Sequence, residues 1–270
     1  MITNLDKDAI VIGGDLPVSR IGLGTNRIQQ NEKSVQALKK ATALGINFID
    51  TASAYTGGAS EEVIGQTLAP YHDTVIATKG GMSAPDFHID SRPETLARQL
   101  ELSLKKLKLK TIDLYLLHRV DPNVPLKESI LFLKQMQSEG KIKHIGLSQV
   151  SITQIEEARK YVDIVAVENE YNLSERMFDD VVDYAEKEGI VFIPFFPLHF
   201  DIANEQILQQ LMQKYNATVQ QLALAWLLKR SPLMLPIPGS LSVKHLEENA
   251  TAIKINLSDE DFEKLSDSAI

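Results

Sequence analysis

The chain has 270 residues, 44% of them hydrophobic, with a formal net charge of −8 and no cysteine. The acidic balance argues against a nucleic-acid backbone or an anionic membrane surface as the main partner, and the lack of cysteine excludes disulfides and thiolate metal sites. The length suits one α/β barrel or two small domains.

The first residues, MITNLDKDAI, lack the basic start and apolar run of a signal peptide. No stretch approaches the ~20 consecutive apolar residues that cross a bilayer. We therefore expect a cytoplasmic protein with no membrane partner and no nucleic-acid partner.

The first predicted element is a β-hairpin. The segment AIVIGGDLPVSR has two short extended runs around Gly13, Gly14 and Asp15, which is typical of a two- or three-residue turn. Such a hairpin can close the bottom of a barrel.

Eight short apolar runs then alternate with segments of helical period. The predicted strands are RIGLGT (20–25), INFIDT (46–51), TVIATK (74–79), DLYLLH (113–118), KHIGLS (143–148), DIVAVEN (163–169), IVFIPFF (190–196) and LMLPIPG (233–239). Three helix starts fit a capping box: Ser91 with Glu94, Ser151 with Gln154, and Thr218 with Gln221.

This alternation predicts a parallel sheet, and eight units allow it to close as a (β/α)₈ TIM barrel. A doubly wound open sheet is the alternative. No linker, low-complexity tract or composition shift divides the chain, so we expect one domain over residues 1–270.

In such a barrel, functional residues gather where the strands end. Five predicted strands end in polar residues: Asp50, which leads to Tyr55, then Lys79, His118, Ser148, and Glu168 with Asn169. Each alone has a structural explanation, for example a turn cap or a core histidine. Together they are typical of acid–base catalysis, because a neighbouring ammonium lowers the pKa of a tyrosine and so makes it a better proton donor. Lys79 is the candidate ammonium for Tyr55, with Asp50 as its counter-ion.

The strings NFIDTASAY, VIATKGG, DLYLLHRVDP, IGLS, ENEYNL and PIPGS resemble the aldo-keto reductase family, in order and over almost the whole chain. The resemblance implies a catalytic tetrad of Asp50, Tyr55, Lys79 and His118. It implies that a nicotinamide cofactor passes a hydride to a carbonyl carbon while Tyr55 protonates the oxygen and His118 orients it.

Cofactor-binding residues are also implied by the resemblance. The candidates are Gly24, Thr25, Asp50, Ser148, Gln149, Glu168, Phe195, Pro197, Leu198, Gly239, Ser240, His245, Glu248 and Asn249. Ser148 matches the serine that binds the carboxamide, and Phe195 the aromatic that stacks on the nicotinamide, although Phe195 also fits a core aromatic.

Two of these positions depart from the family pattern near the nicotinamide. Gln149 stands where an asparagine is usual, and Glu168 where a glutamine is usual. A carboxylate near the ring favours its positively charged oxidised form. Our hypothesis is that Glu168→Gln weakens binding of the oxidised cofactor more than the reduced one.

The segment PIPGSLSVKHLEEN resembles the part that holds the adenosine 2′-phosphate. Many family members have lysine at Gly239 and arginine at His245, which pair with phosphate more strongly. The N–H groups of a helix start after Gly239 can still bind a phosphate. We therefore expect NADPH, with NADH possible.

Other chemistries have little support in the sequence. Arg27 stands where the third glycine of a Rossmann fingerprint belongs, and the six histidines show no metal-binding spacing. Two rivals stay open: a redox-sensing module of the same fold, and an isomerase or aldolase that uses Lys79 as a Schiff-base nucleophile.

The substrate depends on loops at the barrel rim, expected over Gly80–Arg92, Arg119–Lys127 and His199–Gln206. We expect a small carbonyl substrate and a monomer or weak homo-oligomer.

Overall fold

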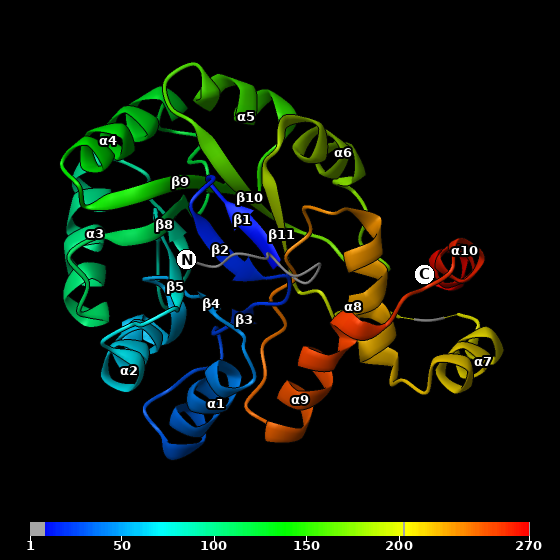
Figure 1. Cartoon of the computed structure of the whole chain (residues 1–270). Coiled ribbons are helices and arrows are strands. Elements are labelled where there is room, and N and C mark those ends of the chain that lie inside the picture. Colours follow the sequence, from blue (N-terminus) through cyan, green and yellow to red (C-terminus); the bar gives the residue numbers. More distant parts are fainter. Residues whose placement is uncertain (1–8, 202, 270) are drawn as a thin grey trace.

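The computed structural model describes residues 9–201 and 203–269. Its centre is a seven-stranded parallel sheet whose neighbours follow one another in the sequence, with helices around the outside (Figure 1). The strands are β3 (Leu23–Gly24), β4 (Phe48–Asp50), β5 (Val75–Gly80), β8 (Ile112–Leu117), β9 (Ile142–Ser148), β10 (Ile164–Glu170) and β11 (Val191–Phe195). The predicted barrel is confirmed, and the open doubly wound sheet is excluded.

The helices form an outer layer whose apolar faces pack on the sheet. They are α1 (Glu32–Ala43), α2 (Ala59–Leu68), α3 (Pro93–Leu107), α4 (Leu126–Ser138), α5 (Ile152–Arg159), α6 (Asp179–Glu188), α7 (Glu205–Tyr215), α8 (Val219–Arg230), α9 (Val243–Thr251) and α10 (Asp259–Ser268), with the short 3₁₀ helices η1 (Tyr55–Gly58) and η2 (Ala252–Lys254). Among the described residues, none of these helices has the length and apolar character needed to cross a membrane.

The eighth predicted strand is an extended segment, 233–239, rather than a regular strand. On one side it makes a single parallel bridge, Phe192 with Met234, and on the other Gly22 N–H donates to the Pro236 carbonyl at 2.9 Å. Pro236 and Pro238 have no N–H, so the segment cannot form a continuous ladder. We call residues 233–239 the seam.

Gly24 lets the seam approach β3 closely. A Cβ at this position would lie 2.6 Å from the carbonyl oxygen of Ile237, which no side chain tolerates. Glycine at this position therefore allows the barrel to close between β3 and the seam, where few hydrogen bonds join the two segments.

The predicted hairpin is β1 (Ala9–Ile12) paired antiparallel with β2 (Leu16–Ser19), joined by Gly13, Gly14 and Asp15. Its buried side chains, Ile10, Ile12, Leu16 and Val18, pack against residues of the barrel interior. Asp15 pairs with His144 at 2.6 Å, near the beginning of β9. The hairpin therefore plugs the end of the barrel where the strands begin, as predicted.

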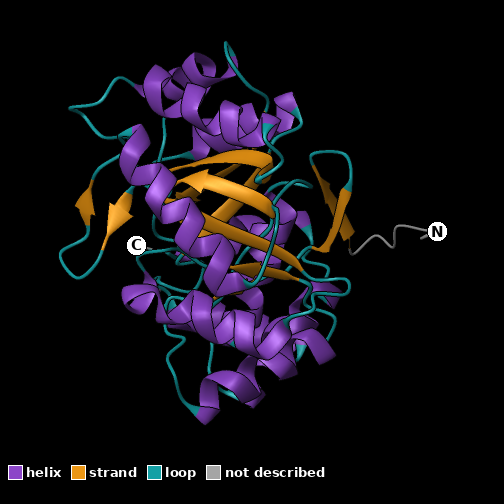
Figure 2. Ribbon diagram, turned by 90° about the vertical axis from the view of Figure 1, so that its left-hand side faces the viewer, coloured by secondary structure: helices purple, strands orange, loops and turns teal. Residues whose placement is uncertain are grey.

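A second, smaller hairpin lies at the opposite end. It pairs β6 (Met82–Ser83) with β7 (His88–Ile89) in the loop that follows β5. Figure 2 shows the two hairpins beyond opposite ends of the sheet, with β1 and β2 next to the N-terminus.

Two of the three predicted capping boxes are confirmed, at Ser151 before α5 and at Thr218 before α8. The third was wrong. Helix α3 begins at Pro93, with Arg92 as its N-cap and no side-chain cap. Ser91 is instead buried, and both its carbonyl and its hydroxyl bond to the Ser129 hydroxyl. Because Pro93 already lacks an N–H and has the φ of a first helical residue, the helix starts without a serine cap.

The predicted absence of a signal peptide concerns residues 1–10, and residues 1–8 of that stretch lie outside the described residues.

Candidate active site

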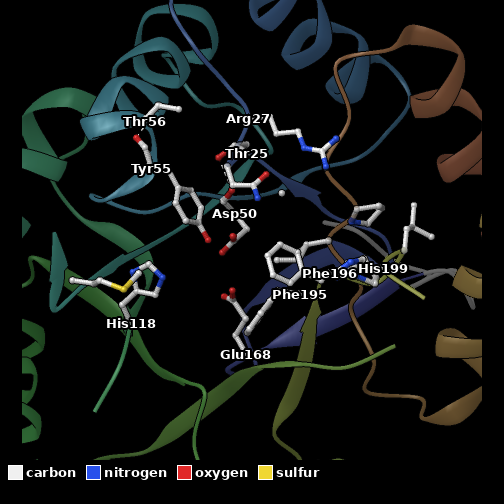
Figure 3. Close-up of a pocket in the computed structure, with 18 of the residues that line it drawn as sticks. Thr25, Arg27, Asp50, Tyr55, Thr56, His118, Glu168, Phe195, Phe196 and His199 are labelled. Carbon is white, nitrogen blue, oxygen red and sulfur yellow. Dashed lines mark hydrogen bonds between the residues drawn. The ribbon is translucent and has the colours of Figure 1, made fainter. Parts of the chain in front are cut away.

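A cavity of about 580 Å³ opens at the end of the barrel where the strands terminate. All three predicted rim loops reach it, through Met82 and Phe87, through Arg119, and through His199. Its other lining residues are Gly24, Thr25, Asn26, Arg27, Asp50, Tyr55, Thr56, His118, Glu168, Phe195, Phe196, Pro197, Leu198, Ile237, Pro238 and Gly239 (Figure 3).

Lys79 and Asp50 form a fully buried ion pair at the base of this cavity. The two residues end neighbouring parallel strands, so their side chains meet at one rim. Lys79 Nζ lies 2.7 Å and 2.6 Å from the two carboxylate oxygens of Asp50, and it also donates to the Thr51 carbonyl at 3.0 Å. Burial alone would lower the pKa of Lys79, but Asp50 and Glu168 outweigh it and raise that pKa, so the lysine stays charged.

Tyr55 begins η1, directly after the loop that follows β4. Its hydroxyl lies 3.5 Å from Lys79 Nζ, and its ring meets His118 edge-on, with 5.9 Å between the ring centroids. Burial raises the pKa of Tyr55 above its ordinary value, while the Lys79 ammonium acts to lower it. The lysine therefore acts in the direction that the sequence predicts, although in the cofactor-free protein burial prevails.

His118 directly follows β8 and is buried, with its ring beside that of Tyr55 on the cavity wall (Figure 3). Burial, with the charges of Lys79 and Arg119, holds its pKa well below the usual range, so the imidazole is neutral near pH 7. Its Nδ1 has no hydrogen-bond partner among the described residues. A neutral imidazole has one N–H to donate to a substrate oxygen.

Glu168, on β10, brings a second carboxyl group to the same lysine. Its Oε2 lies 3.2 Å from Lys79 Nζ, but without the geometry of a hydrogen bond, and within the described residues this oxygen has no other partner. Burial raises the pKa of Glu168 to about 8, with the charge of Asp50 adding to the effect. This carboxyl group is therefore largely protonated at neutral pH.

Arg119 is a site residue that the sequence analysis assigned only to a loop. Its guanidinium donates to the Ser148 hydroxyl at 3.0 Å and lies 5.6 Å from the centre of the Phe195 ring. These are the two residues that the resemblance assigns to the nicotinamide. Its place directly after His118 was the signal that could have identified it, because the first residue beyond a strand shares the same rim.

Eight of the candidate cofactor residues line the cavity: Gly24, Thr25, Asp50, Glu168, Phe195, Pro197, Leu198 and Gly239. Ser148 and Gln149 lie beside it rather than on its wall. Ser148 is held by Arg119, and the Gln149 side chain accepts from the Glu170 N–H at 3.2 Å. Gln149 has φ +56, so the chain turns sharply where β9 ends.

The other four candidates lie outside the cavity. Ser240 precedes α9, and its hydroxyl accepts from the N–H of Ser242, the residue that caps this helix. His245, Glu248 and Asn249 lie on α9 itself. They follow Gly239 along the chain, so a long ligand in the cavity would reach them only by passing Gly239.

Two phenylalanines at the cavity mouth hold unusual conformations. Phe87, between β6 and β7, and Phe196, directly after β11, have φ of +54 and +52 and remain 57% and 47% exposed. A bulky side chain rarely adopts such a backbone conformation, and strain of this kind concentrates at binding sites. Phe196 lies in the apolar run IVFIPFF, which predicts burial, and Phe87 lies in a predicted rim loop, where the sequence does not give the exposure of a side chain.

No group of three or more histidine, aspartate or glutamate side chains within the described residues is placed to hold a metal ion.

Known proteins share both the sequence and this architecture. Residues 20–270 match the model of the aldo/keto reductase family. An uncharacterised oxidoreductase of Schizosaccharomyces pombe is 40% identical, with 94% of this chain and 88% of that protein covered. Pyridoxine 4-dehydrogenase of Escherichia coli is 37% identical, with coverage of 92% and 93%.

Solved structures agree. The thermostable aldo-keto reductase Tm1743, crystallised with the inhibitor epalrestat, superposes with a TM-score of 0.87 at 30% identity, covering 96% of this chain and 98% of that one. An aldo-keto reductase of Klebsiella pneumoniae in complex with NADPH gives 0.84 at 27% identity, covering 96% and 93%. The similarity that the motifs indicate is thus confirmed along nearly the full length, and the chain belongs to the aldo/keto reductase family of oxidoreductases.

Proposed function

We propose that this protein reduces an aldehyde or ketone to the alcohol with NADPH, and that Tyr55 is the proton donor. The observation that carries the proposal is the buried ammonium of Lys79, fixed by Asp50 and lying 3.5 Å from the Tyr55 hydroxyl on the cavity wall. An ammonium at this place stabilises the tyrosinate that remains after proton transfer.

The other residues of the tetrad have separate roles. Asp50 keeps the ammonium in place through both carboxylate oxygens. His118, neutral and buried, donates a hydrogen bond that holds the substrate oxygen near Tyr55. The cofactor, when bound, supplies the hydride to the carbonyl carbon.

The cavity fits the nicotinamide end of such a cofactor. Phe195 presents an aromatic ring, and Glu168 has a buried oxygen without a hydrogen-bond partner among the described residues. Protonated, Glu168 offers one donor and one acceptor, as the amide of a glutamine does. Gly239 then opens the way to Ser240, His245, Glu248 and Asn249 for the adenosine end.

NADPH is our choice over NADH, which stays possible. In its favour are the Klebsiella relative, which holds NADPH, and the start of α9 beyond Gly239. Because Gly239 and His245 leave the phosphate without lysine and arginine, we expect a preference weaker than one based on an arginine–phosphate pair.

Two rival functions are less well supported. A Schiff-base mechanism needs a neutral, accessible lysine, whereas Lys79 is fully buried and its pKa is raised. A sensing module would bind the same cofactor but have a pocket closed to carbonyls, whereas here an open cavity of about 580 Å³ has Tyr55 and His118 on its wall.

The test is the loss of NADPH absorbance with a panel of aldehydes and ketones. The panel includes pyridoxal, because one relative is named pyridoxine 4-dehydrogenase. We expect Tyr55→Phe to lower kcat by at least roughly 100-fold while the cofactor Kd is kept. The matched control is Tyr71→Phe, which removes a hydroxyl that bonds to the Leu107 carbonyl outside the cavity.

Cofactor binding without turnover on any carbonyl would overturn the proposal in favour of the sensing module. Full activity in Tyr55→Phe would overturn the role of Tyr55.

A further inference from the structure

Three buried side chains with formal charges meet at the base of the cavity, and their charges do not balance. Asp50, Lys79 and Glu168 are each at most 1% exposed. With both carboxyl groups ionised, these three side chains alone would have a net charge of −1 in the protein interior, which is unfavourable. The next cation is the partly buried guanidinium of Arg119, which interacts electrostatically with Glu168.

The geometry shows which carboxyl group holds the extra proton. Asp50 accepts from Lys79 with both oxygens, at 2.7 Å and 2.6 Å. Glu168 has one oxygen 3.2 Å from the same ammonium, outside hydrogen-bond geometry, and its carboxyl group also interacts with that of Asp50. Ionisation therefore favours Asp50, and the proton resides on Glu168.

We propose that Glu168 is a proton-exchanging group that matches the charge of the nicotinamide, keeping its proton beside the neutral reduced ring and releasing it when the positively charged oxidised ring binds. This inference rests on the proposed function, since it takes the nicotinamide to lie in this cavity. One proton goes to solvent for each oxidised cofactor bound, and no bond other than the carboxyl O–H breaks.

The charge balance explains why the release is favourable. A positive ring next to ionised Glu168 gives a neutral pair, and the cluster with Asp50 and Lys79 is then compensated as a whole. A reduced ring is neutral, so it offers no compensation and the carboxyl group keeps its proton.

The neighbouring groups leave Glu168 as the one that titrates near neutral pH. Those that face it are Asp50 from β4, Lys79 from β5, Tyr55 from η1, and His118 with Arg119 from the end of β8. On the adjoining strands, Ser148 and Ile193 stand opposite Glu168 and have no charge. Lys79 and Tyr55 keep their protons, because the pKa of each is raised, and His118 is neutral, because its pKa is lowered. Burial raises the pKa of Asp50 as well, but its interactions with Lys79 and Glu168 act to lower it, so Asp50 is the carboxyl group of the pair that ionises first.

The experiment counts protons rather than turnover. NADP⁺ and then NADPH are titrated into the protein at pH 7 in a weakly buffered solution with a pH indicator. Both cofactors have the same phosphates, so the difference between them reports the charge of the ring. We expect close to one proton released per NADP⁺ and none per NADPH.

The pH dependence of the Kd values of the two cofactors is a second, independent test. Release of one proton makes the Kd of NADP⁺ fall about tenfold from pH 6 to 7 and less steeply as the pH approaches 8, whereas the Kd of NADPH stays flat. Glu168→Gln abolishes both the release and the slope, and at pH 8 and above it weakens NADP⁺ binding more than NADPH binding.

The matched control is Glu61→Gln. Glu61 is another fully buried carboxyl with a raised pKa, bonded to Thr78 at 2.7 Å and absent from the cavity wall. We expect this variant to keep the wild-type proton count. If Glu168→Gln does not fold, the wild-type contrast between the two cofactors still decides the matter.

Equal proton release with both cofactors, or release that persists in Glu168→Gln, would overturn the inference while carbonyl turnover leaves the proposed function intact. Failure of both cofactors to bind would overturn the two together.

Discussion

The two ends of the barrel differ in chemical character, since one is closed by apolar side chains and the other has buried charged groups. At the end where the strands begin, Ile10, Ile12, Leu16 and Val18 of the hairpin close the interior with apolar contacts. At the other end, buried charged groups face a cavity, and two strained aromatics stand at its mouth. The first arrangement contributes free energy of folding through buried apolar area, while the second concentrates desolvated charge at one rim.

Because of this difference, substitutions at the hairpin end should change mainly the free energy of unfolding, and substitutions at the charged end should change mainly kcat. A substitution in the hairpin should change the free energy of unfolding and leave kcat per folded molecule unchanged. A change in the charged cluster should alter catalysis, and its effect on stability should depend on whether charge remains balanced.

The largest effect is expected from Lys79→Met. It leaves Asp50 without its cation, so we expect kcat to fall by about 100- to 10,000-fold and the free energy of unfolding by roughly 3–5 kcal/mol. Steady-state kinetics and urea unfolding check both values. Adding Asp50→Asn should recover most of the stability and none of the turnover; recovery of turnover would refute the role of the ammonium.

At the opposite end, Ile12→Ala should cost roughly 2–5 kcal/mol of unfolding free energy, because Ile12 is completely buried in the plug. The kcat per folded molecule should be unchanged, as measured well below the melting temperature. Val11→Ala, on the half-buried face of the same strand, serves as the control. A loss of kcat at unchanged stability would contradict the separation of the two ends.

The third prediction concerns pH and the stability of the cofactor-free protein. Glu168 has a pKa of about 8 when folded and an ordinary glutamate value, about 4.3, when unfolded. Between these values the unfolded chain binds fewer protons than the native protein, so stability falls as pH rises. Unfolding of wild type and Glu168→Gln from pH 5 to 8.5 should show a decline that is steeper in wild type, by on the order of a few kcal/mol over this range, because Glu61 and Asp113 also have raised pKa values in both proteins. Parallel curves would contradict it.

The smallest effect is expected from Phe87→Ala. Because the ring is more than half exposed, its loss should leave the melting temperature nearly unchanged and raise KM a few-fold for apolar carbonyls, with kcat retained. Met177→Ala removes an even more exposed apolar side chain outside the cavity and should leave KM unchanged. A KM unaffected by Phe87→Ala would exclude this residue from the substrate pocket.

Much of the fold could be predicted because hydrophobic period and strand ends are local features of the sequence. The hairpin, the seven strands and the convergence of Asp50, Tyr55, Lys79 and His118 follow from them. Residues 233–239 were predicted to be a strand but form an extended segment, because Pro236 and Pro238 lack the N–H groups that continuous strand pairing needs.

Other features depend on contacts between distant segments. Arg119 contacts both Ser148 and Phe195, and the three residues come from the ends of three different strands. The proton on Glu168 depends on its distance from Lys79 and on burial, neither of which the sequence gives. The single domain over 1–270, the cytoplasmic location and a monomer or weak homo-oligomer stay predictions.

The seam has a consequence for synthesis of the chain. Residues 233–239 join β11 to the segment that leads into β3, the last strand of the sheet to the first. Since a nascent chain emerges from its N-terminus, the seven strands can pair in order while both outer edges of the sheet stay unpaired. The barrel can become a closed ring only after residues 233–239 have left the ribosome, so a truncated product lacking the seam would expose two strand edges, the feature on which aggregation begins.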